Sequence, residues 1–168
     1  DLNFSTLISL DSGASVSVDH SPELKKDEDD TRPGVLGSGG PDVFGYRWKD
    51  SDAPGGPAFS WVDITTIGTP IAFTGDDQVV QNIPIGFPFP FYGGTFGTLI
   101  ANTNGYLSFT NTTTTGSYNN FPLPSTSTAE NLLAAFHDDL TFSSLGDAYY
   151  YNDGTRFILS YVAVPRLS

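Results

Sequence analysis

The sequence predicts an all-β fold, a β-sandwich or jelly-roll-like domain that is mostly antiparallel and has long, turn-rich loops. Three observations predict it. Of the 168 residues, 13 are Phe and 8 are Tyr, which are enriched in strands. The 18 Gly and 12 Pro supply tight turns. No segment shows the apolar spacing of a long helix. Short alternating runs between turns are expected to form sheets that pack face to face.

The expected strands are short and follow one another between turn signals. Ala14–Asp19 alternates strictly between apolar and polar residues, as a half-buried strand does. Asn104-Gly105 predicts a hairpin turn. The prolines of Phe87–Tyr92 exclude a central strand and favour an edge or an extended segment, and Ala129–Ala135 is suited to one or two helical turns. The other expected strands are Val43–Trp48, Phe59–Ile64, Pro70–Phe73, Val79–Ile85, Thr98–Ile100, Tyr106–Phe109, Leu132–Phe136, Tyr149–Tyr151 and Arg156–Val164.

Composition divides the chain into three parts. Residues 1–20 hold the first strand candidate, and residues 21–39 are charged and then glycine-rich, as a linker or a long surface loop is. Residues 40–168 carry the remaining strands and are long enough for one domain with its own core. We therefore expect an N-terminal strand segment, a linker and one β-sandwich module.

The chain is acidic, with 19 Asp and Glu against 7 Lys and Arg and a formal net charge of −12. Phosphate backbones and anionic membrane surfaces would be repelled, so nucleic acid is not an expected partner. No apolar run reaches the roughly 18 residues of a transmembrane helix, so membrane insertion is not expected. Calcium suits such a surface because it prefers carboxylate and carbonyl oxygens; alternatively, the charge only maintains solubility. The absence of Cys excludes disulfides and thiolate metal sites.

Four aspartates form the strongest candidate binding site: Asp42, Asp50, Asp52 and Asp63. Asp50-Ser51-Asp52 stands beside two glycines, which places two carboxylates on one side of a tight turn. A hard cation such as Ca²⁺ needs several oxygens at about 2.3–2.6 Å. The spacing is not that of an EF-hand, because no acidic residue stands at the twelfth loop position. The alternative is that these side chains cap turns.

Several aromatic residues are candidates for stacking against a glycan, namely Tyr149, Tyr151 and Tyr92. Tyr149 and Tyr151 share one face of a strand, and Tyr150 takes the other. The alternative is that these aromatic side chains fill the core. Two sequons, at Asn3 and Asn111, are glycosylation acceptors only if the source glycosylates asparagine.

Catalytic constellations are missing from the sequence. It contains neither the Gly-x-Ser-x-Gly elbow nor the His-Glu-x-x-His motif. The acidic pairs Asp76-Asp77 and Asp138-Asp139 could in principle flank a sugar, as glycosidase carboxylates do, but turn formation is the more natural role for such aspartates. The two histidines, His20 and His137, are more often structural in such positions. We therefore expect a protein that is not an enzyme.

Residues 40–165 resemble a non-catalytic, β-rich module of large secreted bacterial proteins, which often accompanies subtilisin-like or other proteases and sorting domains. The latter part, from Phe87, also resembles the nidogen-type extracellular module. The resemblance rests on an ordered series of segments: Gly40–Asp52, Pro57–Ile64, Gly75–Asp77, Ile85–Gly93, Asn102–Phe109, Ala135–Leu140, Tyr149–Tyr151 and Arg156–Tyr161. His137 stands where that pattern commonly has Trp. The pattern normally continues with another hairpin, so we expect either that the chain is truncated or that a partner supplies the missing strands.

The resemblance implies a secreted, extracellular or cell-surface location and a binding or architectural role, such as adhesion or support of a neighbouring domain. The alternatives are a fibre or surface-layer subunit assembled by strand complementation, and a glycan-binding or glycan-active domain. Arg156–Val164 is apolar on both faces, as a strand deep inside a sheet is. Its edge is therefore expected to pair with residues 7–19, with the same segment of a neighbouring copy, or with sequence missing from the chain. Other domains of a parent protein and neighbouring copies are thus the expected partners.

Overall fold

The computed structural model describes residues 9–10, 37–110, 116–119 and 130–167. The chain divides into two compact units, and the division falls at residue 60, within the stretch that the sequence assigns to one module. The N-terminal unit comprises the described residues up to Ser60, and the sandwich unit comprises those from Trp61 onward. All strand pairs are antiparallel and none of the described residues is helical, which confirms the predicted all-β fold.

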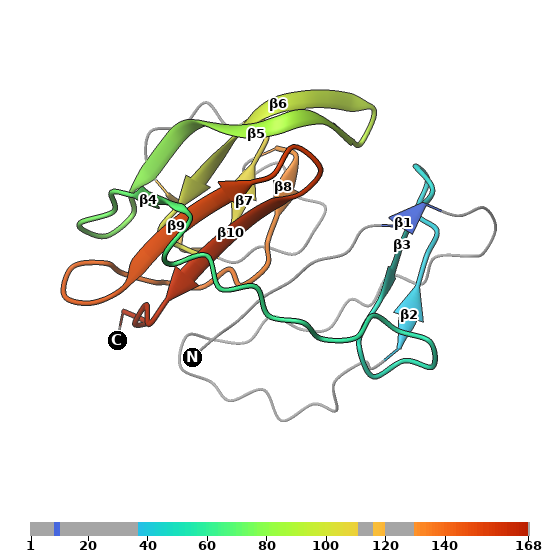
Figure 1. Ribbon diagram of the computed structural model, residues 1–168, viewed down its shortest axis with the longest axis horizontal. Helices are drawn as coiled ribbons and strands as arrows, with labels where there is room; N and C mark the ends of the chain where they lie inside the picture. Colours follow the sequence, from blue (N-terminus) through green and yellow to red (C-terminus); the bar gives the residue numbers. More distant parts are fainter. Residues whose placement is uncertain (1–8, 11–36, 111–115, 120–129, 168) are drawn as a thin grey trace. The chain divides into compact units, whose positions relative to one another are not determined.

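The N-terminal unit contains a three-stranded sheet in the order β1-β3-β2 (Figure 1). Its strands are β1 (Ser9–Leu10), β2 (Ser38–Gly39) and β3 (Tyr46–Lys49). The strand predicted from Val43 begins only at Tyr46, because the N–H of Gly45 donates to the carbonyl of Asp42 at 3.0 Å and closes a turn there. The predicted strand Ala14–Asp19 lies outside the described residues.

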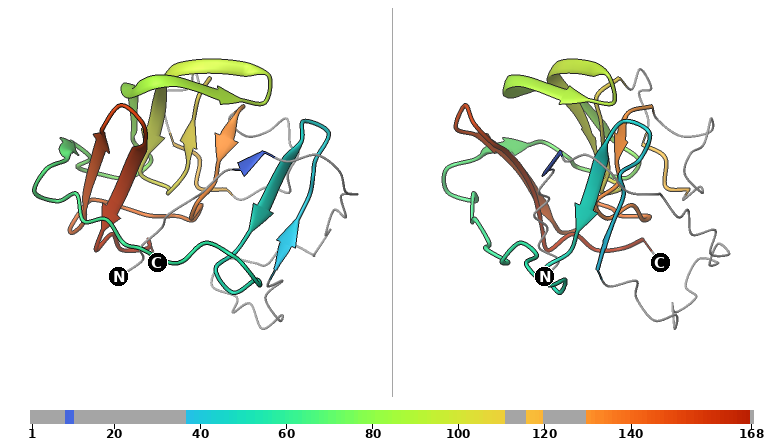
Figure 2. Two further views of the ribbon diagram at one scale, coloured as in Figure 1. Left: turned by 45° about the vertical axis from the view of Figure 1, so that its right-hand side comes forward. Right: turned by 90° about the vertical axis from the view of Figure 1, so that its right-hand side faces the viewer.

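The sandwich unit contains two sheets. One is three-stranded, in the order β10-β9-β4, and the other is four-stranded, in the order β5-β6-β7-β8. The views of Figure 2 show the β9–β10 hairpin and the β5–β6 hairpin in separate layers. The strands are β4 (Thr69–Ile71), β5 (Val79–Phe91), β6 (Gly94–Asn102), β7 (Leu107–Ser108), β8 (Leu132–Leu133), β9 (Asp147–Asn152) and β10 (Phe157–Val162).

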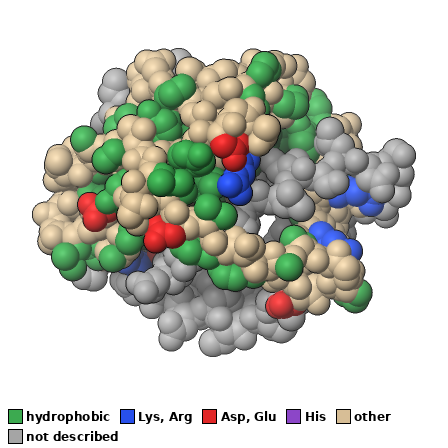
Figure 3. Space-filling model, viewed as in Figure 1, with side chains coloured by type: hydrophobic (Ala, Val, Ile, Leu, Met, Phe, Trp, Pro, Cys, Tyr) green, Lys and Arg blue, Asp and Glu red, His purple; other side chains and the backbone are tan. Residues whose placement is uncertain are grey.

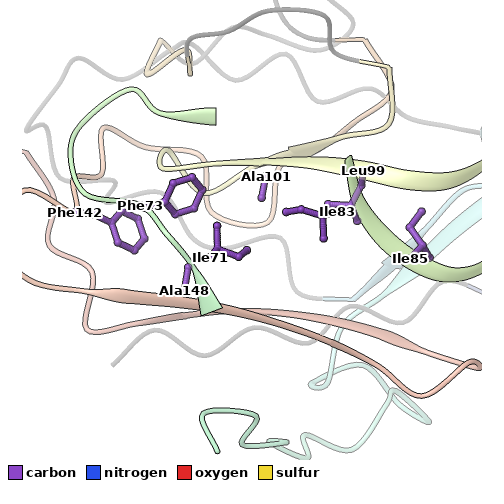
Figure 4. Close-up of a cluster of buried hydrophobic side chains, with 8 residues drawn as sticks. All are labelled: Ile71, Phe73, Ile83, Ile85, Leu99, Ala101, Phe142 and Ala148. Carbon is purple, nitrogen blue, oxygen red and sulfur yellow. The ribbon is translucent and has the colours of Figure 1, made fainter. Parts of the chain in front are cut away.

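One hydrophobic core lies between the two sheets. Ile71 of β4 and Ala148 of β9 come from one layer, and β5 and β6 supply the side chains opposite them (Figure 4). Alternation explains this, since every second residue of a strand points to the same face. The buried cluster consists of Ile71, Phe73, Ile83, Ile85, Leu99, Ala101, Phe142 and Ala148. This shared core makes the unit a β-sandwich.

The long β5–β6 hairpin forms one side of the second sheet. β5 is its edge strand, as the prolines of Phe87–Tyr92 predicted. The pairing of β5 with β6 shifts register twice, once near Asn82 and once near Gly86, which both have positive φ. Beyond the second shift, Phe89 stacks on Phe109 with ring centroids 5.2 Å apart. The phenylalanine-rich segment therefore packs largely on the inside of the sandwich, not on an exposed platform.

Two expected elements are not formed. Residues 59–64 contain no strand, and at their end the carbonyl of Ile64 accepts the N–H groups of Ile67 and Gly68 and begins a turn. The helical turn expected at 129–135 is not formed in its described part, residues 130–135. This part contains β8, which pairs with β7 through Leu133 and Leu107. A search of the described residues found no helix able to span a membrane.

Candidate functional site

Asp42, the first of the predicted calcium ligands, holds the turn between β2 and β3. Its Oδ1 accepts the backbone N–H of Phe44 at 2.9 Å and that of Tyr46 at 2.9 Å. An aspartate that accepts N–H groups ahead of it in the chain forms an Asx turn. This contact fixes where β3 begins.

Asp50 and Asp52 lie together in the turn after β3. Oδ2 of Asp50 accepts the N–H of Gly37 at 2.6 Å, and its Oδ1 accepts the N–H groups of Asp52 at 3.1 Å and Ala53 at 2.8 Å. These bonds, the one from Gly37 first, lower the pKa of Asp50 below its ordinary 3.8. The carboxylate of Asp50 therefore ties the loop before β2 to the turn after β3.

Asp63 belongs to the sandwich unit and has a local role. Its Oδ1 accepts the backbone N–H of Thr65 at 2.9 Å and the hydroxyl of Thr65 at 2.8 Å, which together lower the pKa of Asp63. Among the described residues, no three His, Cys, Asp or Glu side chains are grouped so as to hold a metal ion. The turn-capping alternative thus describes the contacts of Asp42, Asp50 and Asp63.

The candidate glycan-stacking tyrosines come from two different sheets. Tyr149 and Tyr151 lie on the outer face of β9, while Tyr150 points inward and stacks on Phe157 with centroids 6.2 Å apart. Tyr92 follows β5 in the other sheet, is 41% exposed, and meets Phe91 edge-on with centroids 4.6 Å apart. The structure therefore pairs Tyr149 with Tyr151 and leaves Tyr92 apart from them. The sequons Asn3 and Asn111 lie outside the described residues.

The outer face of β9 and β10 is partly covered. Ser160 of β10 lies opposite Tyr149 on this face and is only 3% exposed. A Cβ placed on Gly68 would lie 3.2 Å from the Cβ of Tyr149, so the turn before β4 packs against β9. Hydrophobic side chains gather over β9 and β10 in Figure 3, with few charged groups among them. Tyr149 and Tyr151 are half-buried within this apolar surface.

A buried polar node, which sequence reasoning missed, lies at the turn after β6. Asn102, Thr103 and Asn104 are fully buried. The Nδ2 of Asn104 donates to Asp77 Oδ1 at 2.8 Å, and its Oδ1 accepts the N–H of Leu140 at 3.0 Å. The sequence at this position, Asn-Thr-Asn-Gly, is typical of a surface turn and therefore gave no indication of burial. The node instead joins three loops that are far apart in the chain.

The other acidic and histidine candidates also make structural contacts. The Nε2 of His137 lies 2.8 Å from the carbonyl oxygen of Ser117, and its ring packs on Tyr106 with centroids 4.7 Å apart. Asp138 Oδ2 lies 3.1 Å from the Nε of Arg166. These contacts hold the C-terminal segment and the 137–140 loop in place.

Tyr161 connects β10 to the polar node and should make the sandwich sensitive to alkaline pH. Its hydroxyl donates to the carbonyl of Asn102 at 2.6 Å, and burial raises its pKa above the ordinary value of 10.0. In the unfolded chain Tyr161 ionises near pH 10, while in the folded chain it stays protonated. The stability it contributes is therefore complete below about pH 10 and is lost as the pH rises further.

Denaturant unfolding at increasing pH measures this effect. We expect Tyr161→Phe to cost about 1 kcal/mol at neutral pH, from the lost hydrogen bond, and to lose less stability than the native chain above pH 10. Tyr118→Phe removes a hydroxyl from a residue that is 48% exposed and serves as the control. An equally steep fall in the free energy of unfolding above pH 10 in Tyr161→Phe and in the native chain would contradict the assignment.

The edges of the two sheets differ in how they are protected. β4 carries Pro70, β5 carries three prolines, and β8 has only two residues. Proline, charge and shortness are the usual devices that stop another strand from pairing with an edge. β10 has none of them: Phe157–Val162 is six residues long and contains neither proline nor charge. Within the described residues it pairs only with β9. The β10 edge is thus the least protected edge of the sandwich.

Comparison with known proteins places this fold in a family. A family model described as NIDO related matches residues 55–157, which include β4 to β9 and the first residue of β10. No curated protein and no solved structure matches the chain. The match agrees with the nidogen-type resemblance seen from Phe87 onward. Because it covers more than half of the 168 residues, the chain belongs to the NIDO-related family.

Proposed function

We propose that the chain is a non-catalytic binding or architectural module of a secreted or cell-surface protein. Family membership is the observation that carries this proposal: NIDO-related domains are typical of extracellular proteins and are generally not enzymes. The contacts of Asp42, Asp63, Asp138 and His137 support it, since each of these candidate functional groups fixes a turn or a loop. The role in adhesion or in support of neighbouring domains remains part of the proposal.

Surface labelling tests both halves of this proposal. Antibody against the purified chain should label intact producing cells or their culture medium. The labelled chain should also bind the cell-surface fraction saturably, and the unlabelled chain should compete. Signal found only after lysis would contradict the extracellular location, and binding that does not saturate would contradict the binding role.

A fibre or surface-layer subunit is the second candidate function, and the β10 edge is the observation that favours it. A long, uncharged edge without proline is the feature by which strand complementation joins subunits. Negative-stain imaging at high protein concentration separates this function from the first. Filaments or lattices are expected for a fibre subunit, whereas discrete particles are expected for a module of a larger protein.

Glycan binding is supported only by Tyr149 and Tyr151, which share the outer face of β9. A glycan array with Tyr149→Ala and Tyr151→Ala tests it, and Tyr118→Ala serves as the control on another surface tyrosine. If the face holds a sugar by stacking, both variants should lose signal while the control retains it. Equal signals in all three would contradict glycan binding at this face.

Calcium at the Asp50-Asp52 turn stays a prediction, and its proposed role is to stabilise the N-terminal unit. Backbone carbonyls and water would have to complete the coordination, since the described residues bring no third acidic side chain to this pair. A ligand that binds only the native state stabilises it, so excess chelator should lower the melting temperature. Asp52→Ala should remove most of that sensitivity. A melting curve unchanged by chelator would contradict a calcium role.

A further inference from the structure

The backbone of β10 presents three residues to the edge at which no described strand pairs with it. The N–H of Asp153 donates to the carbonyl of Arg156 at 3.3 Å across the β9–β10 turn. Hydrogen-bonded and non-hydrogen-bonded pairs alternate along an antiparallel ladder, so Ile158 and Ser160 exchange hydrogen bonds with β9. The N–H and C=O groups of Phe157, Leu159 and Tyr161 therefore point away from β9.

Pro70 at the opposite edge of the same sheet supports this alternation. Pro70 lies opposite Tyr149, which also lies opposite Ser160 on its other side. Because Tyr149 directs its backbone groups to β10, the Pro70 nitrogen faces away from β9, where a missing N–H costs nothing. The sheet therefore has one edge closed by proline and one edge with a full set of donors and acceptors.

This edge is complementary to itself. If two β10 strands pair antiparallel about Leu159, then Leu159 lies opposite Leu159 of a second copy, and Phe157 lies opposite its Tyr161. All three residues whose backbone groups face the edge then form hydrogen-bonded pairs, which gives about six interchain hydrogen bonds. A two-fold axis relates the two copies, as in the commonest class of protein dimer.

The same register brings opposite charges together. Arg156 would lie opposite Val162 of the second copy, and Val162 pairs with the exposed Asp147 of its own β9. These residues form one row on the outer face, with Arg156 two strands, or about 10 Å, from Asp147. An extended arginine and an aspartate together span this gap. Arg156 uses its Nε on Asp153 at 2.7 Å, and the guanidinium has two further nitrogens for a second carboxylate.

The position of Arg156 is informative because basic residues are scarce. From Trp61 to the end of the chain, the only Lys or Arg residues are Arg156 and Arg166. The net charge of −12 opposes association of two copies at long range. The two-fold axis would place two Arg156–Asp147 pairs in the dimer, and each pair would offset part of that repulsion at the contact itself.

We propose that two copies of this chain join through antiparallel pairing of their β10 strands, centred on Leu159, and that Arg156 of each copy pairs with Asp147 of the other. The two three-stranded sheets then become one continuous sheet across the dimer. This inference goes beyond the first proposed function, a binding or architectural module, which requires no self-association, and it differs from the fibre alternative because a two-fold pairing closes the β10 edge of both copies.

Sedimentation equilibrium over a wide concentration range tests the pairing. The native chain should show a monomer–dimer equilibrium. Arg156→Asp and Asp147→Arg should each raise the dimer Kd at least about tenfold, because each places like charges in contact. The double variant should restore the Kd to within about threefold of the native value. Arg166→Asp breaks the ion pair with Asp138 but lies outside the register, so it should leave the Kd unchanged.

A native chain that stays monomeric at every concentration would overturn the proposal, whether another segment or another protein covers the edge. A double variant that stays as weak as the single ones, or a control that weakens the dimer equally, would also overturn it. Circular dichroism on each variant confirms that the monomer is folded. These outcomes are independent of the cell-surface experiment.

Cross-linking tests the register directly, because the chain has no cysteine of its own. In the proposed register Ile158 lies opposite Ser160 of the second copy in a non-hydrogen-bonded pair, whose Cα spacing of about 4.5 Å suits a disulfide. A mixture of Ile158→Cys and Ser160→Cys chains should therefore cross-link under mild oxidation faster than either variant alone. Equal rates in the mixture and in the separate variants would exclude this register.

Discussion

Replacing Asn104 by alanine is expected to lower the free energy of unfolding of the sandwich unit by about 3 to 5 kcal/mol. The side chain is fully buried and bonds two separate loops, through Asp77 and through the N–H of Leu140. Alanine leaves the buried N–H of Leu140 without its acceptor, and an unsatisfied buried donor costs more than a hydrogen bond gains. Urea unfolding measures the difference.

Two further variants show whether the buried amide itself is responsible. Asn104→Asp keeps the shape and the acceptor for Leu140, but it loses the donor to Asp77 and brings two carboxylates together, so it should also destabilise strongly. Asn152→Ala is the matched control, since within the described part of the chain the hydrogen bond of the Asn152 amide is a long, exposed one of 3.5 Å to the carbonyl of Pro84. Its effect should stay within about 0.5 kcal/mol. Similar losses in Asn104→Ala and Asn152→Ala would contradict the structural role of the node.

The Asn104-Gly105 turn shows what local sequence signals can and cannot predict. The dipeptide predicts a hairpin, and β6 does pair with β7 around it. Its burial was not predictable in the same way, because turns normally lie at the surface and their polar residues face water. The partners of Asn104 come from residues 27 and 36 positions away in the chain. Contacts between loops of such separation leave no periodic pattern in the sequence.

Strand β10 illustrates a second limit. Its two apolar faces predicted a strand deep inside a sheet, whereas the described residues place it at a sheet edge. Apolar residues on the inner face pack on the core, and the outer face lies in the surface that the turn before β4 partly covers. The apolar pattern predicts that both faces are covered but does not identify the segments that cover them. Of the N-terminal segment expected to cover the edge, Ser9–Leu10 pairs with β3 instead, and the rest lies outside the described residues.

The aspartates show a limit of a different kind. Alternate acidic residues in a glycine-rich turn are compatible with both a cation site and turn capping, because both uses need an oxygen that faces the inside of the turn. The choice depends on where the backbone N–H groups lie. At Asp50 three of them point at the carboxylate, and only the folded backbone reveals this.

Gly105→Ala is expected to cost about 3 kcal/mol or more, because two separate penalties add at this position. Gly105 is buried and has a φ of +73°, a conformation that L side chains rarely adopt. A methyl group there would also collide with the carbonyl oxygen of Phe136, whose N–H donates to the carbonyl of Gly105 at 3.1 Å. Because both sides of this contact are backbone, neither can move away without disturbing the fold.

Gly154→Ala separates the two penalties. Gly154 has a similar φ of +84° in the β9–β10 turn, but apart from its own chain neighbours no described residue lies within 4 Å of an added Cβ. Its substitution should therefore cost only the conformational term, about 1 to 2 kcal/mol. The excess loss in Gly105→Ala then measures the close approach of the 136–140 loop to the turn after β6. Thermal or urea unfolding of both variants makes the comparison, and equal losses would show that the loop does not press on Gly105.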